Sequence, residues 1–462
     1  MIYEERPIVR SVFRAYDIRG VVDAELDESA YYTIGRALAC RLYALERDTV
    51  VIARDGRLTS EKLTHALMHG LIASGIHVVD LGQAATPVMY FATHTLGIDS
   101  GLMVTGSHNP ADYNGIKMVL AGKTSLHSDV DALYDLVVKR QFRDGKGKLT
   151  THNILPAYQQ RITQDIVIER PLKVVVDCGN GIAGPIVPAV LRQLGCDIIP
   201  LYCDVDGRFP NHHPDPSVEA NLVDLKKAVF EHQADLGLAF DGDADRLGVV
   251  TNQGEVIWPD RLMMYYAKHL LARIPGATIA FDVKCSTHLM RVIEEAGGVA
   301  KMCPTGHSIV KSVMKESNAA LAGEMSGHLF FKDRWYGFDD ALYSACRLLE
   351  SMSQSLESLS EQFARIPDSV NTPEIKIPIA DDKKFPFMSN FCEKAVFPEA
   401  EMITIDGLRV EFTHGWGLIR ASNTTPCLVA RFEAIDEPSL IAIQALFRSE
   451  LQKIDQDLVI SF

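Results

Sequence analysis

Short apolar runs alternate with longer amphipathic stretches along most of the chain, and many of these runs end in polar loops. In the first part of the chain the runs 50–53, 78–81 and 101–104 predict buried strands. The rhythm returns at 173–177, 198–201, 236–240 and 247–250, and again at 278–282, 299–302 and 319–322. Strands that alternate with helices in this way indicate α/β domains. The later runs 374–377 and 427–432 predict a fourth, α+β segment.

Breaker residues mark the expected boundaries between these segments. The basic, glycine-bearing stretch 143–148 is typical of a linker, and the turn at 252–254 precedes a helix opened by Pro259. The stretch 367–373, with a proline at each end, follows a helix expected at 355–365. We therefore predict three similar mixed α/β domains and a smaller C-terminal α+β domain. Their expected bounds are 1–153, 154–256, 257–367 and 368–462.

Composition and charge narrow the class of protein. The chain has 462 residues, of which 47% are hydrophobic, enough to fill the cores of several domains. Its net charge of -14 argues against a nucleic-acid or anionic-membrane partner, so a phosphate ligand would need a locally basic cleft. Nine cysteines without a C-x-x-C pair or zinc spacing are typical of reduced core residues. Because neither a signal peptide nor a bilayer-length apolar stretch is apparent, we expect a cytoplasmic location.

The first chemically informative loop is Thr105-Gly106-Ser107-His108-Asn109-Pro110, which ends the run 101–104. Gly106 permits a tight turn and Pro110 stops the strand, so free backbone N–H groups can receive phosphate oxygens. Ser107 is therefore a candidate nucleophile. An Asx turn or a helix cap is the structural alternative.

The second loop carries Asp241, Asp243 and Asp245 at alternate positions, so that the three carboxylates can converge on one hard cation. A calcium EF-hand would place Gly and Glu where this chain has Arg246 and Asn252. Three oxygen ligands leave room for water or a substrate phosphate, which favours Mg²⁺ over zinc. A solvated acidic turn is the alternative, although buried, unpaired carboxylates would be costly between two apolar strands.

Two further loops and several isolated side chains suit a sugar phosphate. Glu324, Ser326 and His328 alternate and could bind vicinal hydroxyls, while a capping serine and a satisfied loop histidine are the alternative. The last loop offers cationic, hydroxyl and amide groups for a phosphate dianion, from Arg420, Ser422, Asn423, Thr424 and Thr425. A simple turn before the next strand is the alternative. Other candidates for the same cleft are Tyr16, Arg19, Lys117, Lys284 and His307.

The motifs T-G-S-H-N-P, D-G-D-A-D-R, G-E-M-S-G-H and R-x-S-N-T-T-P, in this order, resemble those of the α-D-phosphohexomutase family across the whole chain. F-R-A-Y-D-I-R-G and the G-E-M-S-G-H form are most similar to the bacterial bifunctional phosphomannomutase/phosphoglucomutase branch, since phosphoglucosamine mutases typically carry Gln at the position of Met325. Ala244 stands where many relatives have Gly, an exchange that we expect to leave the metal loop intact.

The resemblance implies four domains around a central cleft, with a mobile fourth domain and a hinge that we expect at 367–372. Ser107 would be the phosphoserine beside Mg²⁺, and the three aspartates would hold the metal with it. The third loop would bind the sugar, and the fourth would bind the distal phosphate.

The implied reaction is reversible phosphoryl transfer between O1 and O6 of mannose and glucose phosphates. It would pass through phospho-Ser107 and a hexose 1,6-bisphosphate that reorients, with glucose 1,6-bisphosphate as activator. Lys117, His108 and His328 are candidates for moving the hydroxyl proton, and Arg19 and Arg246 for neutralising charge; the sequence does not choose among them.

The alternatives are a phosphoglucosamine mutase, a metal-dependent sugar phosphatase and a non-catalytic sugar-phosphate sensor. A phosphatase would usually need a second metal, for which the sequence offers no further ligand cluster. A sensor could have lost Ser107 or an aspartate, and this chain retains both. The expected partners are small hexose phosphates, without nucleic acid or membrane, and we expect a monomer.

Overall fold

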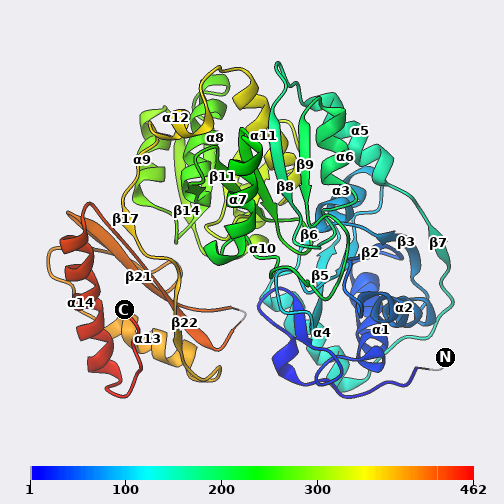
Figure 1. Cartoon of the computed structure of the whole chain (residues 1–462). Coiled ribbons are helices and arrows are strands. Elements are labelled where there is room, and N and C mark those ends of the chain that lie inside the picture. Colours follow the sequence, from blue (N-terminus) through cyan, green and yellow to red (C-terminus); the bar gives the residue numbers. More distant parts are fainter. Residues whose placement is uncertain (1–2, 424) are drawn as a thin grey trace.

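Four β-sheets follow one another along the chain in the computed structural model, which describes residues 3–423 and 425–462. Figure 1 shows them arranged around an arc, with the C-terminal lobe (orange to red) facing the N-terminal lobe (blue). The predicted architecture of three mixed α/β units and a C-terminal α+β unit is confirmed.

The first sheet has the strand order β1-β5-β4-β2-β3-β7, with β6 paired to β5. The strands β2, β3, β4 and β7 are parallel to their neighbours in this group, whereas β5 runs antiparallel to β4 and β1. Its elements are η1 (Arg10–Val12), β1 (Ile18–Val21), α1 (Glu28–Ala44), β2 (Thr49–Arg54), α2 (Ser60–Ala73), β3 (His77–Gln83), α3 (Thr86–Thr95), β4 (Gly101–Val104), β5 (Tyr113–Leu120), β6 (Lys123–Thr124), α4 (His127–Lys139) and β7 (Leu149–Thr151).

The second sheet has the order β12-β11-β10-β8-β9, parallel between β9, β8 and β10 and antiparallel beyond β10. Its short strand β12 straddles the expected boundary after residue 256, and the four expected boundaries stay a prediction. The elements are α5 (Leu155–Asp165), β8 (Lys173–Asp177), α6 (Val187–Gln193), β9 (Asp197–Leu201), η2 (Glu219–Leu222), α7 (Val223–His232), β10 (Leu236–Phe240), β11 (Leu247–Thr251) and β12 (Val256–Ile257).

The third sheet has the order β14-β13-β15-β16, in which only β16 runs antiparallel to its neighbour. The helix expected at 355–365 is shorter, because α11 ends at Ser353 and α12 begins only after Ser358, whose side chain forms a capping box with Glu361. The elements are α8 (Pro259–Arg273), β13 (Thr278–Asp282), α9 (Thr287–Glu295), β14 (Val299–Cys303), α10 (His307–Glu316), β15 (Leu321–Gly323), β16 (Leu329–Phe331), α11 (Ala341–Ser353) and α12 (Leu359–Phe363).

The fourth sheet is antiparallel throughout, with the order β17-β22-β21-β20-β19 and β18 paired to β22. Its two helices lie on the left of Figure 1 in the C-terminal lobe. The elements are β17 (Val370–Asn371), β18 (Ile375–Pro378), α13 (Lys384–Lys394), β19 (Glu401–Ile403), β20 (Leu408–Phe412), β21 (Gly415–Ala421), β22 (Cys427–Ala434) and α14 (Glu437–Ile454).

One apolar core runs through the first three sheets, whereas the fourth sheet has a core of its own. The shared core includes Met103, Leu238 and Phe281, one from each of the three sheets. The fourth core is separate. Among the described residues, its apolar link to the third sheet is a small cluster of Val283, Trp416 and Leu418, with Met302 packed against it. Burial of apolar surface therefore couples the first three units strongly and the fourth one weakly.

No helix in the described residues is long and apolar enough to cross a membrane. All nine cysteines are free thiols, and six of them are buried. Cys40, Cys203 and Cys392 are half-buried, so the expectation of core positions is wrong for these three.

Candidate active site

Ser107 lies in a tight turn at the end of β4, with its side chain next to the metal loop of the second sheet. Its φ of 51° is in the left-handed region, and the residue is almost fully buried. The backbone N–H of Ser107 donates to Thr105 Oγ1 at 2.8 Å. Its Oγ lies 3.2 Å from Asp241 Oδ2 and 3.2 Å from His108 Nδ1. The hydroxyl proposed as nucleophile is thus placed against an acidic site.

Two residues that the sequence analysis missed, Asp55 and Arg57, hold this turn from the end of β2. The Arg57 guanidinium donates to four carbonyl oxygens of the turn and its continuation, those of Ser107, Asn109, Pro110 and Tyr113, at 2.5 to 3.0 Å. Asp55 Oδ2 accepts from Thr105 Oγ1 at 2.7 Å and from the Gly106 N–H at 3.2 Å. A polar Arg54-Asp55-Gly56-Arg57 loop after a strand parallel to β4 was the available signal.

Asp241, Asp243 and Asp245 form a fully buried triad in the loop between β10 and β11. One oxygen from each lies within 4.8 Å of the others, as a single cation would require. Asp241 Oδ1 accepts from the N–H groups of Asp245 and Arg246 at 3.0 and 3.1 Å, which fixes the loop. Burial, and then the charges of Asp243 and Asp245, raise the pKa of Asp241 well above its usual range. The site is therefore short of positive charge.

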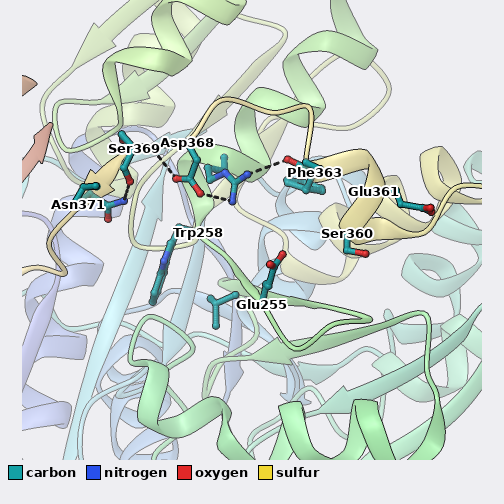
Figure 2. Close-up of a pocket in the computed structure, with 12 residues that line it drawn as sticks. Glu255, Trp258, Ser360, Glu361, Phe363, Asp368, Ser369 and Asn371 are labelled. Atoms are coloured by element: carbon teal, nitrogen blue, oxygen red, sulfur yellow. Dashed lines mark hydrogen bonds and ion pairs between the residues drawn. The ribbon is translucent and has the colours of Figure 1, made fainter. Parts of the chain in front are cut away.

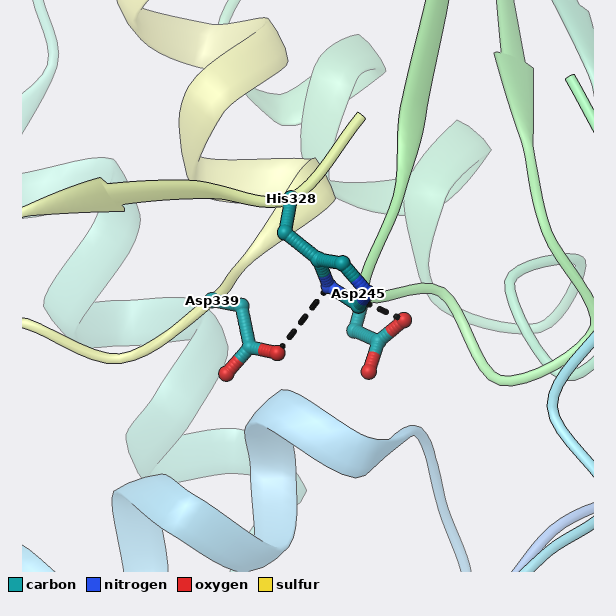
Figure 3. A group of neighbouring side chains, drawn as sticks. All are labelled: Asp245, His328 and Asp339. Atoms are coloured by element: carbon teal, nitrogen blue, oxygen red, sulfur yellow. Dashed lines mark ion pairs between the residues drawn. The ribbon is translucent and has the colours of Figure 1, made fainter. Parts of the chain in front are cut away.

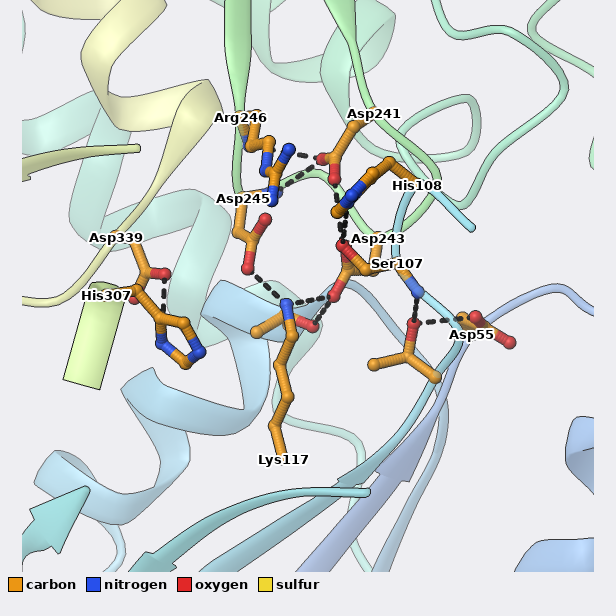
Figure 4. Close-up of polar contacts among 12 residues, drawn as sticks. Asp55, Ser107, His108, Lys117, Asp241, Asp243, Asp245, Arg246, His307 and Asp339 are labelled. Atoms are coloured by element: carbon orange, nitrogen blue, oxygen red, sulfur yellow. Dashed lines mark hydrogen bonds and ion pairs between the residues drawn. The ribbon is translucent and has the colours of Figure 1, made fainter. Parts of the chain in front are cut away.

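Lys117 of β5 supplies part of that charge (Figure 4). Its Nζ donates to Asp243 Oδ2 at 2.6 Å and also to Asp245 Oδ2. Burial opposes the ammonium form, but the two aspartates outweigh it and raise the pKa of Lys117. Asp243 Oδ1 and Asp245 Oδ1 have no hydrogen-bond partner. These two oxygens, with Asp241 Oδ2, remain available for a metal, so the residues present fit a hard cation.

His328 lies between the metal loop and Asp339, another residue that the sequence analysis missed (Figure 3). Its Nδ1 is 3.1 Å from Asp339 Oδ2 and 3.6 Å from Asp245 Oδ1, and Arg246 Nε lies 3.1 Å from its Nε2. Asp339 also pairs with Lys311 Nζ at 2.8 Å. Asp245, His328 and Asp339 could hold a second metal by spacing. Because both imidazole nitrogens already face charged neighbours, we interpret the trio as an orienting network.

His108 and Arg246 complete the polar cluster around Ser107. Burial, and then the nearby cations Arg246, Arg19 and Lys117, hold the pKa of His108 well below its usual range. Arg19 Nη2 donates to Asp17 Oδ2 at 2.8 Å, and its Nη1 donates to Asn109 Oδ1 at 3.3 Å. The predicted catalytic candidates are thus brought together in one place.

The loop that carries Glu324, Ser326 and His328 meets the turn before α10. Glu324 Oε1 accepts the Gly306 N–H at 2.5 Å, and burial is the main cause that raises the pKa of Glu324. The ring of Tyr16 meets that of His307 edge-on at 4.9 Å between centroids. Ser326 is half-buried on the same loop as Glu324.

The end of β21, with Arg420 and the residues that follow it, contacts the third sheet near the same turn. Arg420 Nε donates to Asp406 Oδ2 at 2.8 Å, and Asp406 also accepts the Thr305 N–H at 2.9 Å. Asn423 Nδ2 donates to the Thr305 carbonyl at 3.4 Å. Arg420 Nη2 is buried without a hydrogen-bond partner. A guanidinium nitrogen in that state is available to an anion.

Three further predicted residues lie near this contact between the third and fourth sheets: Ser422, Thr425 and Lys284. The hydroxyls of Ser422 and Thr425 lie 2.8 Å apart. Lys284 Nζ donates to Glu374 Oε1 at 2.5 Å, which links the third and fourth sheets. Thr424 lies outside the described residues.

A separate pocket of about 730 Å³ lies away from these residues, where β12, α8 and α12 meet the chain entering β17. Figure 2 shows Trp258, Glu255 and Asp368 around it. In the wall of this pocket, the Arg261 guanidinium pairs with Asp368 at 2.9 Å and donates to the Phe363 carbonyl at 3.0 Å. The pocket borders the expected hinge rather than the serine and metal loops.

The fold and the site together define a four-domain α/β protein with a serine and a buried acidic triad suited to phosphoryl transfer. Its segments match the phosphoglucomutase/phosphomannomutase domains: alpha/beta/alpha domain I at 10–144, domain II at 156–254, domain III at 258–370 and the C-terminal domain at 374–449. The chain belongs to the phosphoglucomutase/phosphomannomutase family.

Relatives support this assignment along the whole chain. The chain is 50% identical over 452 residues to a phosphomannomutase/phosphoglucomutase of Pseudomonas aeruginosa, covering 98% of both chains. It is 46% identical over 449 residues to a phosphoglucomutase of Neisseria meningitidis, covering 96% of this chain and 97% of the relative. A crystal structure of a family protein from Burkholderia thailandensis is 46% identical and has a TM-score of 0.93, covering 98% of this chain and 100% of that one.

Proposed function

We propose that the protein moves a phosphoryl group reversibly between O1 and O6 of mannose and glucose phosphates, as an isomerase that works through phospho-Ser107. The observation that carries this proposal is the 3.2 Å approach of Ser107 Oγ to the buried aspartate triad. A metal held by Asp241, Asp243 and Asp245 would lie beside the phosphoserine. We propose that this metal is Mg²⁺, because the triad offers only carboxylate oxygens.

Bound there, Mg²⁺ would supply positive charge to the phosphoryl oxygens in transit. The protein's own residues do the positioning: Arg57 fixes the turn, and the Lys117 ammonium offsets the charge of Asp243 and Asp245. The substrate's free hydroxyl approaches phospho-Ser107 while the Arg420 loop holds its existing phosphate. His108, His328 and Lys117 stay the candidates for moving the hydroxyl proton.

The first transfer yields a hexose 1,6-bisphosphate and free Ser107. The bisphosphate then turns around, so that its other phosphate reaches Ser107 and the isomerised monophosphate is left. Glu324 and Ser326 would bind hydroxyls in both orientations. Glucose 1,6-bisphosphate added from outside would rephosphorylate Ser107 and therefore act as an activator.

An isomerisation assay tests the proposal directly. Purified protein with Mg²⁺ and a trace of glucose 1,6-bisphosphate should convert both glucose 1-phosphate and mannose 1-phosphate into their 6-phosphates. Intact mass should show one phosphate, which Ser107→Ala removes together with turnover while substrate binding remains. Active protein that is wholly unphosphorylated and gains nothing from bisphosphate would overturn the phosphoserine scheme.

The turn-around step also predicts the specificity. O3 and O4 lie near the middle of the sugar and can meet Glu324 in either orientation, whereas the 2-hydroxyl changes its surroundings. We expect specificity constants for the two epimers within roughly tenfold, a gap of about 1.4 kcal/mol. Glu324→Gln should impair both substrates alike, because it weakens a charge-assisted bond to shared hydroxyls. A Glu324→Gln variant that damages only one epimer would contradict a dual-substrate enzyme.

The alternatives gain no support from the comparisons. A phosphatase would release inorganic phosphate faster than it isomerises, and the isomerisation assay measures both products. A phosphoglucosamine mutase would prefer glucosamine phosphates in the same assay. The expected monomeric state and cytoplasmic location stay predictions, which sedimentation and cell fractionation can test.

A further inference from the structure

Two cysteine thiols meet at the ends of neighbouring parallel strands in the second sheet. Cys178 directly follows β8, and Cys203 comes two residues after β9. The Cys178 N–H donates to the Leu201 carbonyl at 3.1 Å, and Tyr202, at a φ of 51°, turns the chain between them. The two Sγ atoms lie 3.5 Å apart. In the part of the chain that the structure describes, no other two cysteine sulfurs are in hydrogen-bonding contact.

The two thiols differ in exposure and in acidity. Cys178 is fully buried, whereas Cys203 is half-buried. The hydrogen bond between the two sulfurs lowers the pKa of the Cys203 thiol, whereas burial raises the pKa of the Cys178 thiol. A more exposed and more acidic thiol beside a buried one is the usual arrangement of an attacking and a resolving cysteine.

We propose that Cys178 and Cys203 form a reversible disulfide when the protein meets a peroxide, and that this bond weakens the metal loop. In the first step the Cys203 thiolate attacks hydrogen peroxide, so that an S–O bond forms, the O–O bond breaks and hydroxide leaves. In the second step Cys178 attacks the sulfenic sulfur, the S–S bond forms and the hydroxyl leaves as water with the Cys178 proton. Two thiols and one peroxide thus give one disulfide and two waters.

The strand ends already place the sulfurs close to bonding distance. A disulfide has an S–S separation of about 2.05 Å, so the sulfurs need to approach by about 1.5 Å. That approach displaces the segment after β8 or the one after β9.

The segment after β8 supports the metal loop from behind. The Gly181 N–H donates to the Cys178 carbonyl at 2.7 Å, and the Ile182 N–H donates to the Gly242 carbonyl at 3.2 Å. Gly242 lies between Asp241 and Asp243, and a Cβ placed on Gly181 would come within 3.0 Å of the Gly242 backbone. A shift at Cys178 is therefore transmitted to the aspartate triad through backbone contacts.

Peptide mapping tests the bond itself. Reduced full-length protein is treated with hydrogen peroxide, and free thiols are counted after denaturation. The count should fall by two, and a non-reducing digest should contain a peptide pair that joins Cys178 to Cys203. Cys203→Ser and Cys203→Ala should abolish the pair and keep basal turnover, whereas Cys392→Ser, at another half-buried thiol, should change neither. Oxidation of Cys203 to a sulfinic acid without the pair, or a pair with another cysteine, would overturn the proposal.

A calorimetric Mg²⁺ titration tests the coupling to the metal loop. The oxidised protein should bind Mg²⁺ roughly tenfold more weakly than the reduced one, the effect expected when a group supporting metal ligands moves. Dithiothreitol should restore the affinity, and Cys203→Ser should show no change on peroxide treatment. Equal Mg²⁺ affinity of the disulfide form and the reduced form would overturn the coupling. Any effect of the disulfide on turnover rests on the proposed mutase function, but the thiol count and the Mg²⁺ affinity do not, so the two proposals can fail separately.

Discussion

At the scale of single residues, the arginine beneath the Ser107 turn makes four hydrogen bonds to backbone carbonyls. Arg57 donates to four carbonyls and holds Ser107 in a left-handed conformation that a non-glycine residue adopts only under constraint. We expect Arg57→Lys to lower kcat by about 100-fold, because a single ammonium cannot replace the fork and a small misplacement of a reacting group is costly.

KM should change little in that variant, since the sugar and phosphate loops are untouched. Steady-state kinetics with glucose 1-phosphate measure both constants. Arg54→Lys is the matched control: Arg54 also lies at the end of β2, but within the described residues its guanidinium pairs with Glu61 alone, at 3.5 Å. Unchanged kcat in Arg57→Lys would show that the Ser107 turn keeps its conformation without the guanidinium of Arg57.

A second residue, Asp340, makes stability depend on pH. It caps α11 by accepting the Tyr343 N–H at 2.9 Å, and burial raises its pKa from 3.8 to about 7. The folded carboxyl therefore holds its proton more tightly than the unfolded one, so this residue's contribution to stability falls as pH rises between those two values. From about pH 5 to about pH 8 we expect a loss of about 3 kcal/mol.

Asp340→Asn keeps an acceptor for Tyr343 and removes the titration. The difference between the thermal midpoint of the variant and that of the natural protein should therefore shift in favour of the variant as pH rises. Calorimetry at about pH 5 and at about pH 8 measures both midpoints. Exposed Asp197→Asn is the control and should keep a constant offset. A constant offset for Asp340→Asn as well would contradict the raised pKa.

One property marks several of the residues that the sequence analysis identified: they lie in a polar loop that directly follows an apolar run. That pattern led to Ser107, the three aspartates and Glu324. The same pattern does not identify Asp339 and Lys311. Lys311 lies within a helix and Asp339 in an irregular loop, and only the folded structure shows which residues they contact. Asp55 and Arg57 also follow a strand, but only the pairing of β2 with β4 shows that they support Ser107.

At the scale of elements, the serine turn and the metal loop pack backbone to backbone. A Cβ on Gly242 would lie 2.4 Å from the Ser107 carbonyl oxygen, a distance that no side chain tolerates. Gly242→Ala should therefore push the two loops apart and lower kcat by about 100-fold. Steady-state kinetics and a Mg²⁺ titration measure the effect.

The neighbouring Ala244 provides the control. It has a φ of 63°, so Ala244→Gly relieves backbone strain while giving up a buried methyl group. We expect that variant to retain activity, in keeping with the prediction that alanine leaves the loop intact. Loss of activity in both variants would show that the loop is sensitive to any change rather than to the approach of Ser107.

Buried strands were the most predictable elements, because a short apolar run between polar loops leaves few other choices. The strands β8, β10 and β13 match their predicted runs residue for residue. The run 319–322 was less well placed, since β15 starts only at Leu321 and extends to Gly323. At 355–365 the amphipathic pattern was continuous, and only the capping box of Ser358 reveals where the helix restarts.

At the scale of the whole molecule, the fourth domain is held to the third mainly by polar contacts. Arg409 donates to the Val283 and Cys285 carbonyls at 2.6 and 2.7 Å, and Ser286 Oγ donates to Glu433 at 2.8 Å. Water can replace such bonds at modest net cost. β17 pairs with β22 and therefore belongs to the fourth domain. Within the expected hinge 367–372, the backbone can change conformation only in the residues before Val370.

Substrate should therefore draw the fourth domain inward, because the free Arg420 nitrogen gains a phosphate partner. We expect a smaller radius of gyration by small-angle scattering with saturating glucose 1-phosphate, and altered hydrogen exchange in the residues just before β17. Glucose without a phosphate is the control and should leave both unchanged. Identical scattering with and without substrate would contradict the closure.

Relative domain placement could not be predicted from the sequence, because no local pattern encodes which loops meet across domains. The family resemblance implied the convergence, and the contact of Ser107 with Asp241 and that of Arg246 with His328 now give it a physical form. The weak apolar contact between the fourth domain and the rest is likewise not encoded locally. It follows from the fourth sheet having its own apolar core, separate from the one that the first three sheets share.

The cluster around Trp416 gives the molecule a built-in optical reporter. The indole is buried at the contact with Val283, and the Arg409 guanidinium lies over it at 3.8 Å. The chain has only two other tryptophans, Trp258 and Trp335, and both precede the fourth domain. Separation of the domains would expose Trp416 to water and remove the stacked cation. Its emission would then shift to longer wavelength, so the opening and closing rates could be followed by stopped-flow fluorescence without any added label.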